Sequence, residues 1–380
     1  MSRSNNSIAV LTIPDISDYN SERVNYGICS KLTPEFDVTL LGPEQTSDRI
    51  TNTFDIKRGV KRDFRNKWLR RLLLVPLTFY LLYTYVRCER PDIVASFGNL
   101  PVNGLLCAIV SKLTRSDSVV RVTSDFTNLW RHQTGVGSTV GCFVKNNILG
   151  ALSVRLADNV IVLGPVMEEK LQTRGIDSSK LWAIPQPLHI ECEDKQVDES
   201  SASPAVRTEL DIPDEDQLVL FVGYFKRSKG PKRLGRTIRY VMERSTDTHA
   251  VIVGSSGEYE RYVKQTLQKY DQVHFTGWVP HDRLSAYFQS ADVLLHPSNS
   301  EGLPNVVLEA LHYSVPVVAT DSGGEVPVYV SNIGADCQEL GEMLLKRCYH
   351  TDPCPGTVQD PQNRRLYQDL FDSIVSKPSE

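Results

Sequence analysis

The 380-residue chain lacks the patterns that mark several classes of protein. None of its eight cysteines forms a Cys-x2-Cys pair, so the sequence supports neither a zinc site nor a thioredoxin-type redox site. Its His, Asp and Glu residues form no cluster with metal-ligand spacing, so we expect no metal. The net charge of −4 argues against bulk attraction to nucleic acid. We expect the cysteines to be reduced and mostly buried, as in an intracellular protein.

Long apolar segments are also missing. The stretch from Leu72 to Val86 has 15 uncharged residues and contains Pro76. This falls short of the ~20 residues that a membrane-spanning helix needs. The first residues carry too short an apolar run for a signal peptide and lead straight into a predicted strand, Ser7 to Pro14. We therefore expect a cytoplasmic protein.

A basic run precedes the uncharged stretch, and it leaves two interpretations open. Its members are Arg58, Lys61, Arg62, Arg65, Lys67, Arg70 and Arg71. One interpretation is a buried helix whose basic start is a solvated face. The other is a basic, aromatic-rich element that lies on an anionic membrane and attaches the protein to its inner face.

Short apolar runs alternate with helix-length segments through most of the chain. In the first half the predicted strands are 7–14, 36–43, 92–98, 118–124 and 159–164. Runs of this kind predict parallel sheets with helices on both faces. The acidic, Ser- and Pro-containing composition of 191–216 predicts a linker. We therefore expect domains at 1–190 and 217–355, followed by a separate terminal segment, 356–380.

The most informative stretch runs from His296 to Gly324. A predicted strand ends at Pro297, a polar turn follows, and a helix is expected to open at Leu303 or Pro304. Ligands bind at the carboxyl ends of parallel strands, often on a helix N-terminus. Glu301 lies there, and Glu309 follows eight residues later, roughly two helical turns on. Both carboxylates can therefore reach one elongated ligand.

The order Glu301, Gly302, Leu303, Pro304 and Glu309 resembles the Glu-x7-Glu motif of the retaining GT-B glycosyltransferases of family four (glycosyl transferases group 1). The resemblance extends in order over about residues 7 to 345 and is most specific from 273 to 324. It implies an α/β GT-B fold, with two Rossmann-like domains whose parallel sheets face each other across a cleft. It also implies that the helix in 356–380 returns to the N-terminal, acceptor-binding domain.

The resemblance implies transfer of a sugar from a nucleotide-diphosphate donor to a hydroxyl acceptor, with retained anomeric configuration. In this family the first glutamate holds donor-sugar hydroxyls and the second holds the ribose, which assigns these parts to Glu301 and Glu309. The N–H groups of Gly302 and Leu303 would bind the diphosphate, and Asn305 is a lesser candidate for contact. No cofactor and no metal are implied. The expected acceptor is a glycan or a lipid-linked glycan, and no nucleic acid partner is expected.

A basic loop follows the predicted strand Leu218–Gly223. A lysine between a strand and a helix can pair with a phosphate, and the resemblance puts Lys229 in that position. The family usually has an arginine where this chain has Tyr224, so Lys226 or Arg227 would supply the second positive charge. Backbone around Val279 commonly meets the nucleotide base in such enzymes.

Several positions depart from the family pattern. Ser124–Asp125 stands where relatives commonly have a His-Asp pair, which leaves Asp125 as an acceptor-side candidate. The first loop carries Asn20 and Ser21 in place of two glycines, and a short strand expected after Gly324 is not recognisable. A GT-B epimerase or phosphorylase depends on motifs that this sequence does not show.

Two further alternatives stay open. One is a catalytically impaired GT-B relic that binds a nucleotide sugar or a membrane surface. The other is an interaction protein that binds no donor. The sequence does not specify the sugar, nucleotide, acceptor or oligomeric state.

Overall fold

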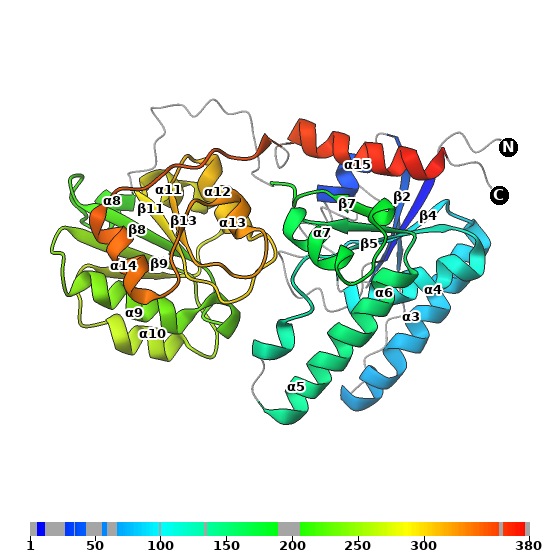
Figure 1. The fold of residues 1–380 in the computed structure, drawn as a ribbon, viewed down its shortest axis with the longest axis horizontal. Coiled ribbons are helices and arrows are strands. Elements are labelled where there is room, and N and C mark those ends of the chain that lie inside the picture. The colour runs from blue at the N-terminus through cyan, green and yellow to red at the C-terminus, as the bar shows by residue number, and fades with distance from the viewer. Residues whose placement is uncertain are drawn as a thin grey trace. The chain divides into compact units, whose positions relative to one another are not determined.

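The computed structural model describes residues 6–11, 27–33, 35–42, 55–58, 67–98, 100–132, 135–188, 206–356 and 360–376. The chain divides into two compact units (Figure 1). Unit 1 comprises Met1–His189 and Gln359–Glu380, and unit 2 comprises Ile190–Val358. The expectations for Asn20 and Ser21, and for Lys61, Arg62 and Arg65 of the basic run, concern positions outside the described residues.

Unit 1 is built on a seven-stranded sheet in the order β3-β2-β1-β4-β5-β6-β7, with every pair parallel. The strands are β1 (Ser7–Leu11), β2 (Asp37–Gly42), β3 (Asp55–Arg58), β4 (Ile93–Ser96), β5 (Asp117–Arg121), β6 (Asn159–Val162) and β7 (Leu181–Ala183). The helical segments are 27–32, α3 (Lys67–Glu89), η1 (Leu100–Gly104), α4 (Leu105–Thr114), η2 (Leu129–His132), α5 (Val136–Phe143), η3 (Val144–Gly150), α6 (Ala151–Leu156), α7 (Pro165–Gln172), η4 (Ser178–Lys180) and α15 (Asp360–Val375).

The strands of this sheet are apolar on both faces because helices cover both. Ile8 and Val10 of β1 face one core, whereas Leu11 faces another, as the two-residue period of a strand requires. The C-terminal helix α15 closes the first core with four buried residues at helical spacing, Tyr367, Leu370, Phe371 and Ile374. Figure 1 shows this helix (red) over the strands of unit 1.

Helix α3 contains the uncharged stretch and is half-buried rather than fully enclosed. Leu82 and Val86 pack against α4, whereas Val75 and Tyr80 are exposed. Within the part of the chain that the structure describes, no helix combines the length and the apolar character needed to cross a membrane.

Unit 2 has a six-stranded parallel sheet in the order β10-β9-β8-β11-β12-β13. Its strands are β8 (Gln217–Val222), β9 (Thr248–Val253), β10 (Val273–Gly277), β11 (Val293–His296), β12 (Val317–Ala319) and β13 (Asn332–Ile333). Its helical segments are α8 (Val206–Glu209), η6 (Arg227–Lys229), α9 (Pro231–Met242), α10 (Glu260–Leu267), η7 (His281–Arg283), α11 (Leu284–Ser290), α12 (Asn305–His312), α13 (Val326–Tyr329) and α14 (Cys337–Lys346).

Two local expectations in unit 2 were wrong. The strand that was not recognised after Gly324 exists as β13, which has only two residues and therefore too short a pattern to detect. Helix α12 begins at Asn305, and Pro304 is its extended N-cap residue rather than a helical one.

The strand order places a switch point between β8 and β11. The chain winds from β8 outward to β9 and β10, and then returns to the other side of β8 as β11. The loops that follow β8 and β11 therefore leave two neighbouring strands at the carboxyl edge of the sheet, where open α/β sheets bind ligands at such a switch point. These are the basic loop and the Glu301 loop.

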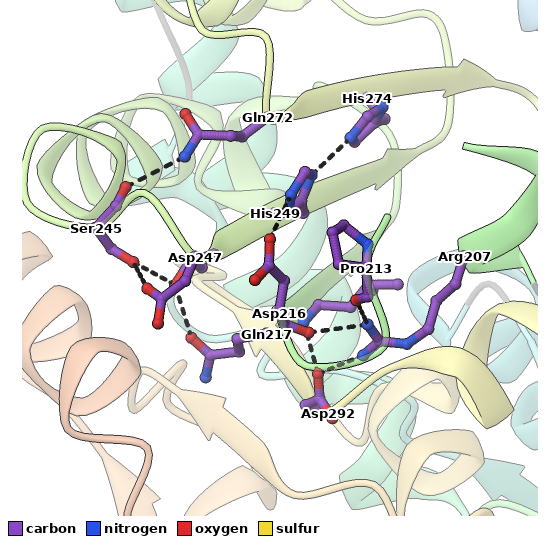
Figure 2. A network of polar contacts seen from close by, with 12 residues as sticks. Arg207, Pro213, Asp216, Gln217, Ser245, Asp247, His249, Gln272, His274 and Asp292 are labelled. Carbon is purple, nitrogen blue, oxygen red and sulfur yellow. Dashed lines mark hydrogen bonds and ion pairs between the residues drawn. The ribbon is translucent and has the colours of Figure 1, made fainter. Parts of the chain in front are cut away.

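Part of the predicted linker belongs to unit 2. Val206 and Ile212 are buried in its core. Figure 2 shows how the side chain of Arg207 fastens this segment. Its guanidinium donates to the carbonyls of Pro213 (2.9 Å) and Asp216 (2.8 Å) and pairs with Asp292 at 2.6 Å.

A histidine pair extends this network along the amino ends of the strands (Figure 2). His249 Nε2 lies 3.1 Å from Asp216 Oδ2, and its Nδ1 lies 3.1 Å from His274 Nε2. Only one proton fits between the two rings, so protonating both histidines would set N–H against N–H. Burial, and next the charge of His249, lower the pKa of His274.

This pair predicts that acid weakens the fold. Below the ordinary histidine pKa of about 6.5, His274 takes up a proton in the unfolded chain but resists it in the folded protein. The unfolding free energy therefore falls as the pH is lowered. The variant His274→Gln should show a smaller fall in melting temperature between about pH 7.5 and about pH 5.5. Circular dichroism melts would measure it, with exposed His350→Gln as the control. An equal fall in His274→Gln and the parent protein would contradict this assignment.

Candidate active site

The two loops at the switch point meet through the predicted lysine and glutamate. Lys229 Nζ lies 2.7 Å from Glu301 Oε1. The hydroxyl of Ser298 donates to the same oxygen at 3.2 Å. The side chains of Lys229 and Glu301 are 28% and 15% exposed, so a ligand can reach both. The structure therefore brings together two residues that lie 72 positions apart in the sequence.

Backbone contacts hold these loops against each other. Asn299 donates from its N–H to Ser228 O (2.7 Å) and from its side-chain amide to Arg227 O (2.6 Å). Gly230 has φ +64°, and a Cβ at this position would lie 1.8 Å from Pro297 O. Only glycine fits where the loops touch.

Arg233 supports the Glu301 loop from α9, and sequence reasoning missed it. Its guanidinium donates to the carbonyls of Pro297 (3.0 Å) and Ser298 (3.3 Å). The hydroxyl of Thr320 donates to Ser298 O at 2.6 Å. Arg233 follows Lys229 by one helical turn, but nothing in the local pattern identifies the carbonyls that it binds.

The turn before α12 leaves backbone donors open. Glu301 N donates to Ser322 O at 3.3 Å, whereas within the described residues no acceptor contacts the N–H of Gly302 or of Leu303. Pro304 has no side-chain oxygen to cap the helix that begins at Asn305. Unpaired N–H groups at a helix N-terminus favour an anion.

Glu309 is buried in α12, with 7% of its surface exposed. Its Oε1 lies 3.0 Å from His281 Nε2, in the segment that follows β10. Val279, two residues before His281, is partly buried against the core of unit 2. Sequence reasoning missed the contact between His281 and Glu309 because these residues come from different elements.

His296 is the last residue of β11 and is 3% exposed. Burial, followed by the positive charge of Lys229, lowers the pKa of His296 to about 3. The ring is therefore neutral near pH 7 and does not titrate there. Its Nε2 has no hydrogen-bond partner among the described residues.

The other predicted cations take different positions. Lys226 is exposed, and its ammonium lies 5.2 Å from the ring centroid of Tyr224. Arg227 contributes its backbone carbonyl to Asn299. Within the described residues, neither side chain forms an ion pair with Glu301.

Asp125 of unit 1 is engaged in a local network. Its carboxylate accepts hydrogen bonds from Thr127 N (3.2 Å), Asn128 Nδ2 (2.7 Å) and Lys170 Nζ (3.0 Å). Burial raises the pKa of this carboxyl, but the hydrogen bonds outweigh burial and hold the pKa below its usual range. This arrangement fits a role in fixing the loop after β5.

The side chains of the described residues form no group of three or more His, Cys, Asp or Glu that could hold a metal ion. At the switch point, Lys229 offers a positive charge beside Glu301, and the N–H groups of Gly302 and Leu303 offer hydrogen-bond donors.

The two parallel sheets and the switch-point loops define a protein with the GT-B fold. HepE of Anabaena in complex with UDP superposes with a TM-score of 0.69 at 15% identity, covering 98% of this chain and 100% of that one. Sucrose-phosphate synthase from Thermosynechococcus elongatus gives 0.67 at 17% identity, covering 97% and 96%. At these identities the likeness concerns the fold, and the predicted GT-B fold is confirmed.

Residues 203–334 match the family described as glycosyl transferases group 1. A Bacillus subtilis protein named for teichuronic acid biosynthesis, the glycosyltransferase TuaC, is 31% identical over 235 residues. That alignment covers 62% of this chain and 54% of TuaC, so the chain spans about half the length of this relative. The match over 203–334 agrees with the family predicted from the sequence.

Gly324 tests how tightly the Glu301 loop is packed. A Cβ at Gly324 would lie 2.2 Å from Gly302 O and 2.3 Å from Glu301 O. Gly324→Ala should therefore cost about 1–3 kcal/mol of unfolding free energy, as overpacking does. The matched control is Gly235→Ala in α9, where the nearest atom is 3.5 Å away. Urea denaturation should show that control unchanged or more stable, and equal effects of both substitutions would refute the tight packing.

Proposed function

We propose that the protein is a retaining glycosyltransferase that moves a sugar from a nucleotide-diphosphate sugar to a hydroxyl of a glycan or lipid-linked glycan. The observation that carries this proposal is the Lys229–Glu301 pair beside the open N–H groups of Gly302 and Leu303. A cation and backbone donors next to a carboxylate suit a ligand with a diphosphate at one end and sugar hydroxyls at the other.

The chemistry follows from where charge develops. When the bond between sugar and phosphate breaks, negative charge builds on the diphosphate and the sugar becomes oxocarbenium-like. Lys229 and the N–H groups of Gly302 and Leu303 stabilise that negative charge because they are held in place before the reaction. These groups need no metal, and the leaving phosphate oxygen receives the proton of the acceptor hydroxyl.

The ion pair between Lys229 and Glu301 also determines which contacts a bound donor has to replace. Lys229 is already neutralised by Glu301 at 2.7 Å. A bound diphosphate takes over the lysine, and Glu301 then accepts hydrogen bonds from the sugar hydroxyls. Ser298 keeps Glu301 in place during the exchange through its 3.2 Å hydrogen bond. Asn305 follows this turn and adds a lesser polar contact.

Glu309 is assigned to the ribose. His281 holds Oε1 of this carboxylate, which leaves Oε2 for a ribose hydroxyl. Val279 lies in the segment before His281, where its backbone would meet the base. Lys226 or Arg227 supplies the second positive charge on the diphosphate, since Tyr224 cannot.

The relatives support a nucleotide-sugar donor and a glycan acceptor. The HepE complex contains UDP, and TuaC is named as a glycosyltransferase of teichuronic acid biosynthesis. We therefore place UDP-sugars first among the donors to be tested. The alternative is an impaired relic that binds a nucleotide sugar without transfer, and a donor that binds but is never consumed would favour it. We further propose a cytoplasmic protein that contacts the inner face of a membrane.

Glu309→Ala tests the donor site. A panel of UDP-, GDP- and ADP-sugars without added metal is applied in thermal-shift measurements. A ligand at 100 times its Kd adds roughly 2.7 kcal/mol to the unfolding free energy, which raises the melting temperature. We expect one nucleotide class to stabilise the parent protein and to lose that effect in Glu309→Ala. Glu342→Ala on α14 is the matched control, and a panel without any shift would overturn the proposal.

Substitution of His281 tests whether its contact with Glu309 contributes to binding of the nucleotide sugar. His281→Ala removes a donor to the carboxylate, and a hydrogen bond to a charged group is worth about 1.5–3 kcal/mol. The affinity for the nucleotide sugar, measured by calorimetry, should fall roughly tenfold or more. His281→Gln keeps an N–H donor and should recover part of the loss. Unchanged affinity in His281→Ala would show that Glu309 needs no such partner.

A further inference from the structure

An arginine of unit 1 is buried without an ion-pair partner among the described residues. Arg121 is the last residue of β5 and lies on the same face of the sheet as Val119, in the core that α15 closes. It is 1% exposed. Its Nη2 donates to Gln186 Oε1 at 3.2 Å, whereas within the described part of the chain its Nε and Nη1 have no hydrogen-bond partner. No carboxylate of the described residues pairs with this guanidinium.

Two more cations lie in the same region. Arg364 of α15 is partly buried, and its Nε has no hydrogen-bond partner among the residues that the structure describes. Lys31 belongs to the helical segment 27–32 and is 6% exposed. Burial, and next the positive charge of Arg364, lower the pKa of Lys31 to about 8. The two side chains are therefore close enough to repel each other.

Tyr367 of α15 connects these cations. It lies three residues after Arg364, on the same side of the helix, and it is fully buried. Burial lowers the pKa of Arg121, and the neighbouring hydroxyl of Tyr367 opposes this shift. That hydroxyl has no hydrogen-bond partner within the described ranges of the chain. We call Lys31, Arg121, Arg364 and Tyr367 the cationic cluster.

The cationic cluster has buried donors without acceptors. Among the described residues four of its donor atoms stay unpaired, namely Arg121 Nε and Nη1, Arg364 Nε and Tyr367 Oη. Buried donors in proteins nearly always have a partner, which is a protein group, a water or an ion. A buried charge is in addition strongly unfavourable unless an opposite charge lies beside it. A water would satisfy the donors but not the charges, so the cluster calls for an anion.

We propose that the cationic cluster is a binding site for a small phosphate-type oxyanion, such as inorganic phosphate. Guanidinium groups form their strongest hydrogen bonds with the oxygens of phosphates and carboxylates. Near pH 7 a phosphate group brings about two negative charges and three or more acceptor oxygens, which suits several cations and donors better than a carboxylate does. Arg364 is the partly exposed member of the cluster, so the anion would enter from its side.

A bound anion would join the two ends of unit 1. Arg121 contacts Gln186, near the end of the first part of this unit, and Asn363 of α15 donates from Nδ2 to Pro185 O at 3.0 Å. Phosphate would therefore hold α15 more firmly on the core that it closes. The inference goes beyond the proposed function and does not depend on it, because the cluster lies in unit 1 and shares no residue with the candidate active site of unit 2.

Thermal unfolding of the full chain tests this site. Sodium phosphate is titrated against sodium chloride of equal ionic strength, and only phosphate should raise the melting temperature. Arg364→Gln removes one charge at a partly exposed position, and its affinity for phosphate should fall roughly tenfold or more. The matched control is Arg365→Gln, which changes an exposed arginine on the same helix and should respond as the parent protein does. Lys229→Ala should keep the response, which separates this site from the candidate active site.

Arg121→Met tests whether the buried charge lacks a partner in phosphate-free buffer. Replacing an unpaired buried charge with an apolar side chain should leave the melting temperature unchanged or raise it, and the response to phosphate should disappear. A lower melting temperature of Arg121→Met, combined with a parent protein that does not respond to phosphate, would assign Arg121 to a carboxylate of the chain itself and overturn the proposal. Equal responses of Arg364→Gln and Arg365→Gln, or a response that Lys229→Ala abolishes, would also overturn it.

Discussion

The contact between the basic loop and the Glu301 loop is the constraint on which the candidate site of unit 2 depends. The carbonyl of Pro297 lies where the Cβ of any other residue at position 230 would be, and Arg233 binds the same carbonyl from the next helical turn. Two neighbouring strands therefore deliver a lysine and a glutamate to within 2.7 Å of each other. The preceding strands are short and buried, so they leave little freedom to the loops that follow them. Backbone packing fixes the positions of the two loops, and only a few side chains supply the chemistry of the site.

This arrangement explains which parts of the site could be predicted from sequence. Glu301, Gly302, Leu303 and Glu309 lie in one local pattern, and a strand followed by a polar turn and an apolar helix is sufficient to locate them. Arg233 and His281 could not be found in this way, because each acts on a carbonyl or carboxylate of a different element. Their partners are defined only once the sheet order is known.

The fold, too, could be predicted where a local sequence pattern exists and could not where contacts between distant residues decide the structure. Parallel sheets followed from continuous apolar runs, since both faces of each strand are covered. The two-residue strand β13 was missed because it carries no detectable period. The segment before β8 was expected to be linker from its acidic composition, yet Arg207 and two buried apolar residues bind 206–216 to the rest of unit 2. Composition averages over a segment, and here a single arginine with four partners outweighs its acidic neighbours.

The position of α15 has a consequence for how the chain is made. Tyr367, Leu370, Phe371 and Ile374 belong to the core that contains β1, although the whole of unit 2 lies between them in the sequence. During synthesis, domains generally fold as units in order from the N-terminus, at roughly 5–20 residues per second. Here the unit that emerges first from the ribosome has to wait for the last helix, so unit 2 can complete its core before unit 1. A premature stop codon shortly before residue 360 would spare unit 2 and leave unit 1, which is made earlier, with an open core.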